Sequence, residues 1–324
     1  MALFLPNSKH KILHRLYIFA KISTIIYSYQ KTLRILNGRD ARPSEFPYVA
    51  RMEYHITNPK TKKVIPRHIC SCTIITKVWT LTAGHCNKGL ENVLTRLGSK
   101  AKGVIRYGPV NKNKKETRMK NTGDIVHLLT HPDYFLFRHK KAGLFIRNDV
   151  GLVKTKEIHM VRYGKISAVD YTTLYGYELM AVGYGLMQSS DGLNTTLALK
   201  KPLQVVKVLA KKCESSVRNI YPVLCLAQRC GTATAVCSGD SGGPALHHGR
   251  VVAVNSAGYP RDCLTSNLRK RPNSVGKLTP ISVFLDWITS HMSVISVILF
   301  YTFIDTYTHL FNLQQICYGI EKYS

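Results

Sequence analysis

Short runs of β-branched and aromatic residues, separated by Gly, Pro and Asn, fill residues 35–287 of the sequence. The apolar residues in these runs show no sustained period of 3.6, which argues against a mainly helical fold. Many short strands with frequent turns are typical of antiparallel barrels or sandwiches. The runs that we expect to form strands include 72–82, 149–155, 178–184, 203–209 and 250–256.

Two apolar segments stand in the C-terminal part of the sequence. Within residues 280–291, Phe284, Leu285, Trp287 and Ile288 recur at helical spacing, and they predict a single closing helix. Residues 294–304 form an apolar run that is shorter than the roughly 20 residues needed to span a bilayer. For this run we prefer a packed element or an extension without a role over an interfacial membrane anchor.

Charge is the most unusual property of the composition. The 324 residues include 46 Lys and Arg and 18 Asp and Glu, which gives a formal net charge of +28. A charge of this size attracts anionic partners at low salt. We prefer an ordinary solvated surface as its interpretation, while docking to polyanions such as sulfated glycans or acidic lipid stays open. No zinc-finger spacing or aromatic pattern predicts recognition of a specific nucleic acid.

The N-terminus and the cysteines bear on the cellular compartment. Lys9 and Lys11 precede an apolar stretch that Lys21 interrupts, and this pattern predicts an imperfect signal peptide. The alternative is a few disordered residues or a misplaced start codon. Nine cysteines are compatible with disulfides in an oxidising compartment. We therefore expect a secreted, extracellular protein.

Catalytic chemistry is indicated most strongly by residues 239–244, Gly-Asp-Ser-Gly-Gly-Pro. A nucleophilic serine needs an exposed hydroxyl on a tight turn, and flanking glycines allow that turn without a Cβ clash. The string resembles the nucleophile motif of the chymotrypsin family of serine proteases, which implies that Ser241 is the nucleophile. In this interpretation the backbone amides of Gly239 and Ser241 form the oxyanion hole.

Two further segments resemble motifs of the same family. Residues 81–86, Leu-Thr-Ala-Gly-His-Cys, resemble its histidine motif, with Gly84 where alanine is more usual, and imply that His85 is the general base. Residues 148–153, Asn-Asp-Val-Gly-Leu-Val, resemble its aspartate motif and imply that Asp149 orients the imidazole. The order His85, Asp149, Ser241 is that of chymotrypsin and differs from the orders in subtilisin and the α/β-hydrolases.

The resemblance covers nearly all of residues 35–291 and implies an all-β fold. This fold has two antiparallel Greek-key β-barrels with a C-terminal helix, and the active site lies in the cleft between the barrels. We accordingly expect a signal or propeptide segment at 1–34, an N-terminal barrel at 35–160, a C-terminal barrel and helix at 161–291, and an extension of unknown role at 292–324.

Activation by cleavage is implied by the residues before the first barrel. Arg34 precedes Ile-Leu-Asn-Gly, which is similar to the cleaved N-terminus of the family. In the family the freed α-amine, here that of Ile35, pairs with the aspartate before the nucleophile, here Asp240. We therefore expect an inactive zymogen and an activating protease as a partner.

The resemblance also implies disulfides, each of which typically stabilises a protein by about 2 to 4 kcal/mol. The implied pairs are Cys70–Cys86, Cys213–Cys225 and Cys237–Cys263. Cys72, Cys230 and Cys317 are left over, and an odd count leaves at least one thiol unpaired or intermolecular. Zinc binding is disfavoured because the chain lacks close paired Cys-x-x-Cys spacing, so we expect no metal and no cofactor.

Substrate preference follows from residues that match the specificity pocket of the family. Ala235 matches the base of that pocket, and Gly258 and Gly276 match its walls. An aspartate at the base would select Arg or Lys, so Ala235 favours Phe, Tyr, Leu or Met before the cleaved bond. Asp262, if it turns inward, would allow a basic residue instead.

Two residues beside the pocket affect how substrate is held. Ser256 matches the residue that pairs with the substrate backbone in the family, and Ala257 stands where a tryptophan usually lines the cleft. The sequence as a whole predicts a serine endopeptidase that hydrolyses proteins or peptides through an acyl-enzyme. The alternative is a catalytically weak or inactive homologue that binds anionic surfaces.

Overall fold

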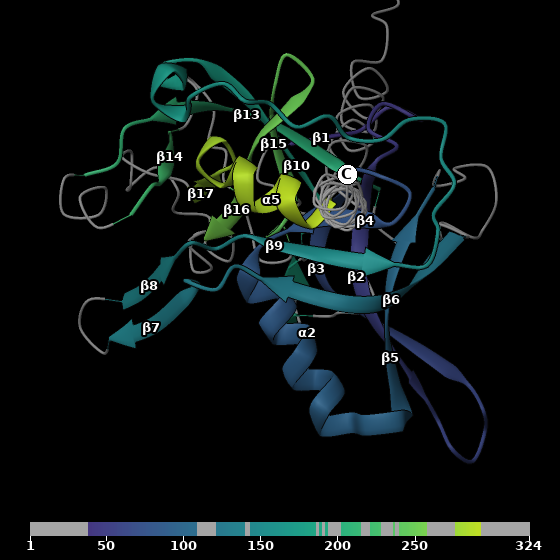
Figure 1. Cartoon of the computed structure of the whole chain (residues 1–324). Coiled ribbons are helices and arrows are strands. Elements are labelled where there is room, and N and C mark those ends of the chain that lie inside the picture. Colours follow the sequence, from purple (N-terminus) through teal and green to yellow (C-terminus); the bar gives the residue numbers. More distant parts are fainter. Residues whose placement is uncertain are drawn as a thin grey trace, which may run out of the picture.

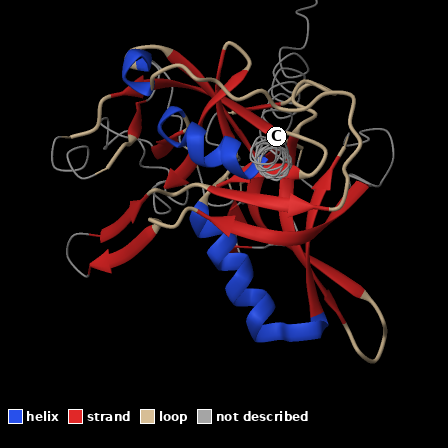
Figure 2. Cartoon of the chain, viewed as in Figure 1, coloured by secondary structure: helices blue, strands red, loops and turns tan. Residues whose placement is uncertain are grey.

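The computed structural model describes residues 38–108, 121–139, 143–185, 188–189, 192–193, 202–214, 221–227, 236, 240–257 and 276–292. The expected signal or propeptide segment, the apolar run 294–304 and the C-terminal extension from 293 onward lie outside these residues. Strands dominate the described part of the chain, as Figure 2 shows.

The first barrel is closed by six antiparallel strands in the order β2-β3-β4-β9-β6-β5. Their bounds are β2 (Val49–Thr57), β3 (Val64–Ile74), β4 (Trp79–Thr82), β5 (Ala101–Tyr107), β6 (Asn121–Thr130) and β9 (Gly151–Thr155). An apolar cluster that includes Met52, Ile74, Ile105 and Val153 fills this barrel. Burial of these side chains is the main force that closes it.

The second barrel is formed by a seven-stranded sheet in the order β1-β13-β10-β15-β16-β17-β14. Because β13 also pairs with β14, the sheet closes on itself, and β1 is added at the side of β13. The bounds are β1 (Arg39–Asp40), β10 (Glu178–Gly183), β13 (Gln204–Lys211), β14 (Leu224–Ala227), β15 (Pro244–His247), β16 (Arg250–Ala257) and β17 (Gly276–Pro280). Leu179, Val208, Leu224 and Leu278 belong to its apolar core.

A third apolar cluster joins the two barrels. It combines Leu81 and Leu152 of the first barrel with Val182 and Val254 of the second. Ile288 of the closing helix α5 (Leu285–Met292), which follows the 3₁₀ turn η4 (Ser282–Phe284), also packs into it. In Figure 1, α5 lies across the middle of the molecule between the strands of the two barrels. The expected all-β fold with two antiparallel barrels and a C-terminal helix is confirmed.

One helix was not expected from the sequence. Helix α2 (Gly84–Leu97) begins beside His85 and packs with its buried Leu90 in the core of the first barrel. The expectation of a single helix was therefore wrong. The remaining short elements are the 3₁₀ turns η1 (Gly98–Lys100) and η2 (Tyr171–Leu174) and the strand pairs β7 (Phe135–His139) with β8 (Gly143–Arg147) and β11 (Gln188–Ser189) with β12 (Gly192–Leu193).

Within the described ranges, none of the helices is both long and apolar enough to cross a bilayer.

Candidate active site

Asp149 is the residue around which the site is organised. Its carboxylate is 1% exposed and lies just before β9, at the boundary between the barrels. Oδ1 accepts a hydrogen bond from the backbone N–H of His85 at 2.8 Å, and Oδ2 lies 2.8 Å from Nδ1 of the same residue. Ser256 of β16 donates its hydroxyl to Oδ2 at 2.6 Å. These three contacts hold the buried carboxylate in one place.

His85 occupies the first turn of α2, where backbone N–H groups lack helical partners. Ala83, the residue that caps this helix, supplies no side-chain hydrogen bond, and Asp149 accepts from the backbone of His85 instead. The same contact fixes the imidazole, because the Nδ1 hydrogen bond to Oδ2 places the ring proton on Nδ1. Nε2 is left as the basic nitrogen, and it lies 3.7 Å from Sγ of Cys86.

The electrostatics of His85 favour its charged form. Burial lowers the pKa of this imidazole, but the negative charge of Asp149 and the hydrogen bond to it raise the pKa by more, so the net shift is upward. A histidine in this setting accepts a proton more readily than a buried histidine without a carboxylate partner.

Ser241 stands on a tight turn between Asp240 and the start of β15. The turn is closed by hydrogen bonds from Gly242 N to Asn255 O at 2.7 Å and from Gly243 N to Asp240 O at 2.9 Å. Gly242 has a φ of 76°, a left-handed conformation that glycine adopts without strain. The side chain of Ser241 remains partly exposed.

A contact between the barrels joins this turn to strand β3. Ser71 of β3 donates its backbone N–H to Ser241 O at 2.9 Å, and its hydroxyl accepts from Tyr184 N at 2.9 Å. The neighbouring Cys70 forms a disulfide with Cys86, which directly follows His85. His85 and Asp149 are thus in direct contact, and the serine turn is joined through Ser71 to β3, the strand that also carries the disulfide partner of Cys86.

Asp240 is fully buried beneath the turn. Its Oδ1 accepts a hydrogen bond from Gly185 N at 2.6 Å. A Cβ on Gly185 would lie 2.6 Å from the carboxyl carbon of Asp240, so only glycine fits there. Arg34 and Ile35, the other residues predicted to take part in activation, lie outside the described residues.

The remaining predicted binding residues are only partly described. Ser256 and Gly276 lie in β16 and β17, whereas Ala235, Gly239 and Gly258 lie outside the described residues, as does Asp262. Gly276 is buried and pairs with Leu226 of β14. The hydrogen bond from Ser256 to Asp149 is a contact that the sequence pattern did not predict.

Two of the three predicted disulfides lie within the described residues. Cys70–Cys86 and Cys213–Cys225 are both formed, as expected. The third expected pair, Cys237–Cys263, and the leftover Cys230 and Cys317 lie outside the described residues. Cys72 is a buried free thiol, and burial raises its pKa, so it stays protonated at neutral pH.

A possible metal-binding group was found next to His85. The sulfurs of Cys70 and Cys86 and a nitrogen of His85 lie within 4.8 Å of one another. Both sulfurs are consumed by the disulfide, so neither is a thiolate that could bind a metal.

Sequence reasoning missed Asn87, which anchors the histidine helix. Its side-chain amide donates to Leu129 O at 2.8 Å and to Leu152 O at 3.1 Å, on β6 and β9. Asn87 is 1% exposed, so these two bonds fix the start of α2 against the barrel. No motif in the sequence includes Asn87, so its role follows only from the structure.

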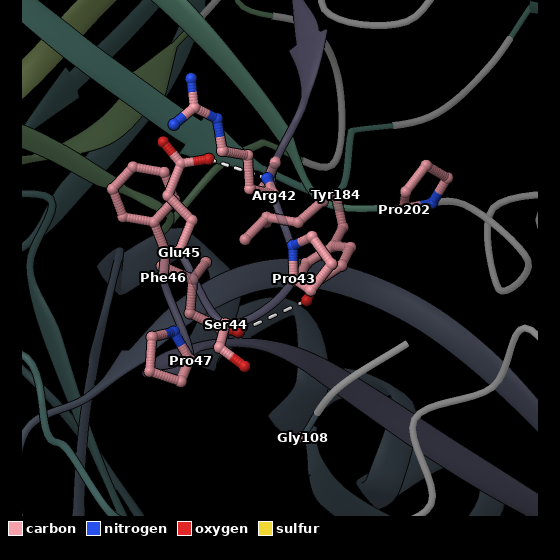
Figure 3. Close-up of a pocket in the computed structure, with 12 residues that line it drawn as sticks. Arg42, Pro43, Ser44, Glu45, Phe46, Pro47, Gly108, Tyr184 and Pro202 are labelled. Atoms are coloured by element: carbon pink, nitrogen blue, oxygen red, sulfur yellow. Dashed lines mark hydrogen bonds between the residues drawn. The ribbon is translucent and has the colours of Figure 1, made fainter. Parts of the chain in front are cut away.

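A separate hollow with a cavity volume of about 80 Å³, open to solvent, lies beside residues 42–47 and Pro202 (Figure 3). None of the predicted site residues lines it. Tyr184 lines this hollow and also contacts the serine region, because its backbone N–H donates to the hydroxyl of Ser71 at 2.9 Å. We assign no chemistry to this hollow.

The crowding around Gly84 explains why the histidine motif has glycine here instead of the usual alanine. A Cβ there would lie 2.9 Å from Cδ2 of Tyr134 and 3.2 Å from the backbone oxygen of Val150. Overpacking of this kind typically costs about 1 to 3 kcal/mol. We expect Gly84→Ala, although it restores the usual residue, to lower the free energy of unfolding by about that amount in urea denaturation.

Gly89 in the same helix is the matched control for this substitution. A Cβ at Gly89 would meet no atom within 4 Å, and alanine is favoured over glycine in a helix by about 1 kcal/mol. Gly89→Ala should therefore raise the free energy of unfolding. If both substitutions change the free energy of unfolding equally, crowding at Gly84 does not contribute to stability.

Comparisons with known proteins agree with this arrangement. The family model for trypsin matches residues 35–288. The trypsin of Phaedon cochleariae is 24% identical over 276 residues, covering 81% of this chain and 90% of that protein. Serine protease 1 of Drosophila melanogaster is 23% identical over 268 residues, covering 81% and 86%. Vitamin K-dependent protein C of Mus musculus is 24% identical over 265 residues, covering 80% and 52%.

A solved structure shares the fold. Neuropsin, described as a serine protease expressed in the limbic system of mouse brain, matches with a TM-score of 0.54 and 18% identity, covering 80% of this chain and 100% of that chain. The family match spans both barrels and includes His85, Asp149 and Ser241. The chain therefore belongs to the trypsin family of serine proteases.

Proposed function

We propose that this chain is an active serine endopeptidase in which Ser241, His85 and Asp149 hydrolyse peptide bonds. The observation that carries this proposal is the double contact of Asp149 with the backbone N–H and the Nδ1 of His85, both at 2.8 Å. This contact leaves Nε2 as the base and aligns the ring for proton transfer.

The proposed reaction has two halves. The hydroxyl of Ser241 attacks the carbonyl carbon of the peptide bond while its proton passes to Nε2 of His85, and Asp149 stabilises the imidazolium that forms. His85 then gives this proton to the leaving amine, and the acyl group stays on Ser241. A water molecule, deprotonated by His85, attacks the acyl-enzyme and releases the second product. The amides of Gly239 and Ser241 are proposed to hold the oxyanion in both halves.

We further propose that the enzyme is made as a zymogen that is activated by another protease. Support comes from Arg34 before Ile35 in the sequence and from the complete burial of Asp240 under the serine turn. Cleavage after Arg34 would supply an ammonium group at Ile35 to pair with this carboxylate. A buried carboxylate gains most from such a partner.

Activation can be tested by replacing residue 35. The chain cut after Arg34 should hydrolyse peptides with Phe, Tyr, Leu or Met before the cleaved bond, and the uncut chain should not. Ile35→Gly should lower kcat/KM of the cut chain by at least tenfold with the triad unchanged, because glycine supplies the amine but no side chain to bury. Full activity of the uncut chain would contradict the zymogen proposal.

Secretion is also part of the proposal. It is supported by the basic and apolar pattern of the N-terminus and by the two disulfides, which form in oxidising compartments. N-terminal sequencing of the chain recovered from culture medium tests it. The alternative, a non-catalytic protein that binds anionic surfaces, gains no support from the comparisons.

A further inference from the structure

A small open depression lies directly beside the proposed triad. It is shallow and is lined by Ile146, Tyr221, Val223, Ser256, Ala257 and Lys277, among others. Ser256 connects it to the triad, because its hydroxyl is bonded to Oδ2 of Asp149. A substrate side chain that enters this depression would therefore belong to a residue close to the cleaved bond.

Most of the side chains that line the depression are apolar and pack against neighbouring side chains. Tyr221 and Val223 are 8% and 3% exposed and pack with the Cys213–Cys225 disulfide in one cluster. The ring of Tyr221 meets the ring of Phe145 edge to face, with 5.3 Å between centroids. Side chains that are already packed lose little conformational entropy when a ligand binds against them.

Lys277 is the cation in these walls. Its neighbour Leu278 belongs to the core of the second barrel, and alternate residues of a strand face opposite sides. Lys277 therefore points away from the core, on the face that it shares with its cross-strand partners Ala257 and Cys225. The small side chain of Ala257 leaves the space beside this lysine open.

The charge of Lys277 is incompletely compensated by the described residues. Burial lowers the pKa of its ammonium group, and the negative charge of Glu214 opposes this shift. No ion pair between Lys277 and any carboxylate is found in the described part of the chain. A partly desolvated ammonium without a close counter-ion binds a carboxylate more strongly than an exposed lysine does.

We infer that the depression is a substrate subsite in which Lys277 binds the carboxylate of an acidic side chain, so that the enzyme favours polypeptides with Glu or Asp near the cleaved bond. The apolar walls accommodate the methylene groups of Glu, and Lys277 binds its charged end. The net charge of +28 adds a long-range attraction for acidic polypeptides. This inference rests on the proposed function, because it names the substrate class of the same site.

Binding of matched peptides tests the inference without requiring hydrolysis. Fluorescent peptides carry either Glu or its neutral isostere Gln at one position at a time on both sides of the expected cleaved bond. Their dissociation constants are measured by anisotropy with the chain that carries Ser241→Ala and has been cut after Arg34. At one position, Glu should bind about tenfold more tightly than Gln. With Lys277→Met added, this ratio should fall below about twofold, and with Lys277→Glu a Lys peptide should be preferred.

Lys165→Met is the matched control. Lys165 is exposed, and its backbone bonds to Val251 near the opposite end of β16 from Ala257, so the preference for Glu should be unchanged. Equal binding of Glu and Gln at every position, or a preference for Glu that survives Lys277→Met, would overturn the inference. Failure of the proposed function is seen separately, as absence of hydrolysis by the chain that retains Ser241.

Discussion

Ser241→Ala is expected to lower kcat by about 10⁶-fold. The alanine removes the hydroxyl oxygen that is proposed to form the acyl-enzyme, while backbone hydrogen bonds hold the turn around it. Ser71 N to Ser241 O and Gly242 N to Asn255 O do not involve the lost hydroxyl. The fold should therefore survive, and the measurement is kcat on a peptide substrate together with the unfolding midpoint.

Ser290→Ala is the control for this loss. Its hydroxyl donates to Trp287 O on the exposed side of α5 and has no link to the triad. Activity of this variant should stay within about twofold of the parent, since substitutions at such surface positions have small effects. Substantial hydrolysis by Ser241→Ala would mean that another residue is the nucleophile.

Asp149→Asn is expected to lower kcat by about 10⁴-fold. The asparagine keeps the size of the side chain, but its amide cannot accept from both the backbone N–H and the Nδ1–H of His85 as the carboxylate does. The imidazole then favours the tautomer in which Nε2 carries the proton, and it can no longer act as a base. The measurement is kcat of the cut enzyme near neutral pH.

The pH dependence of kcat/KM is a second test of the Asp149→Asn substitution. In the parent, kcat/KM should rise as pH increases through the raised pKa of His85, because only the neutral imidazole accepts the proton from Ser241. In Asp149→Asn, the burial that lowers the pKa remains, and the carboxylate that raised it is gone. The midpoint of the residual activity should therefore move to lower pH. An unchanged midpoint would show that Asp149 does not act on the titrating group.

Strands were predicted well where the β-branched pattern ended at a visible turn residue. The expected run 250–256 agrees with β16, and 178–184 agrees with β10. The run 72–82 was expected to be one strand, but it is divided between β3 and β4. Thr76 makes this turn, because its hydroxyl accepts from Val78 N and Trp79 N. A threonine inside a β-branched run is a weak turn signal, so the break was hidden.

Helix α2 could not be predicted because its stability comes from contacts distant in sequence. Gly84 and Gly89 weaken its intrinsic helical preference. The helix is held instead by Asn87 on two strand carbonyls, by the disulfide at Cys86 and by Asp149 at its first turn. Each of these partners is at least 16 residues away along the chain.

The sequence predicted those residues of the candidate site that belong to short motifs. Three motifs in the right order named Asp149, His85 and Ser241, and the structure places His85 and Asp149 in direct contact. The supporting contacts of Ser71, and the lysine that lines the neighbouring depression, belong to no motif. They arise only when β3 meets the serine turn and when β17 lies beside Ala257.

The central claim is that Ser241 is a nucleophile activated by His85 under the control of Asp149. Covalent labelling by a fluorophosphonate, located by peptide mass spectrometry, tests it most directly. The chain cut after Arg34 should add one label at Ser241, and His85→Ala should slow labelling by at least 10³-fold. A cut, folded chain whose Ser241 stays unlabelled, or labels equally fast without His85, would contradict the claim.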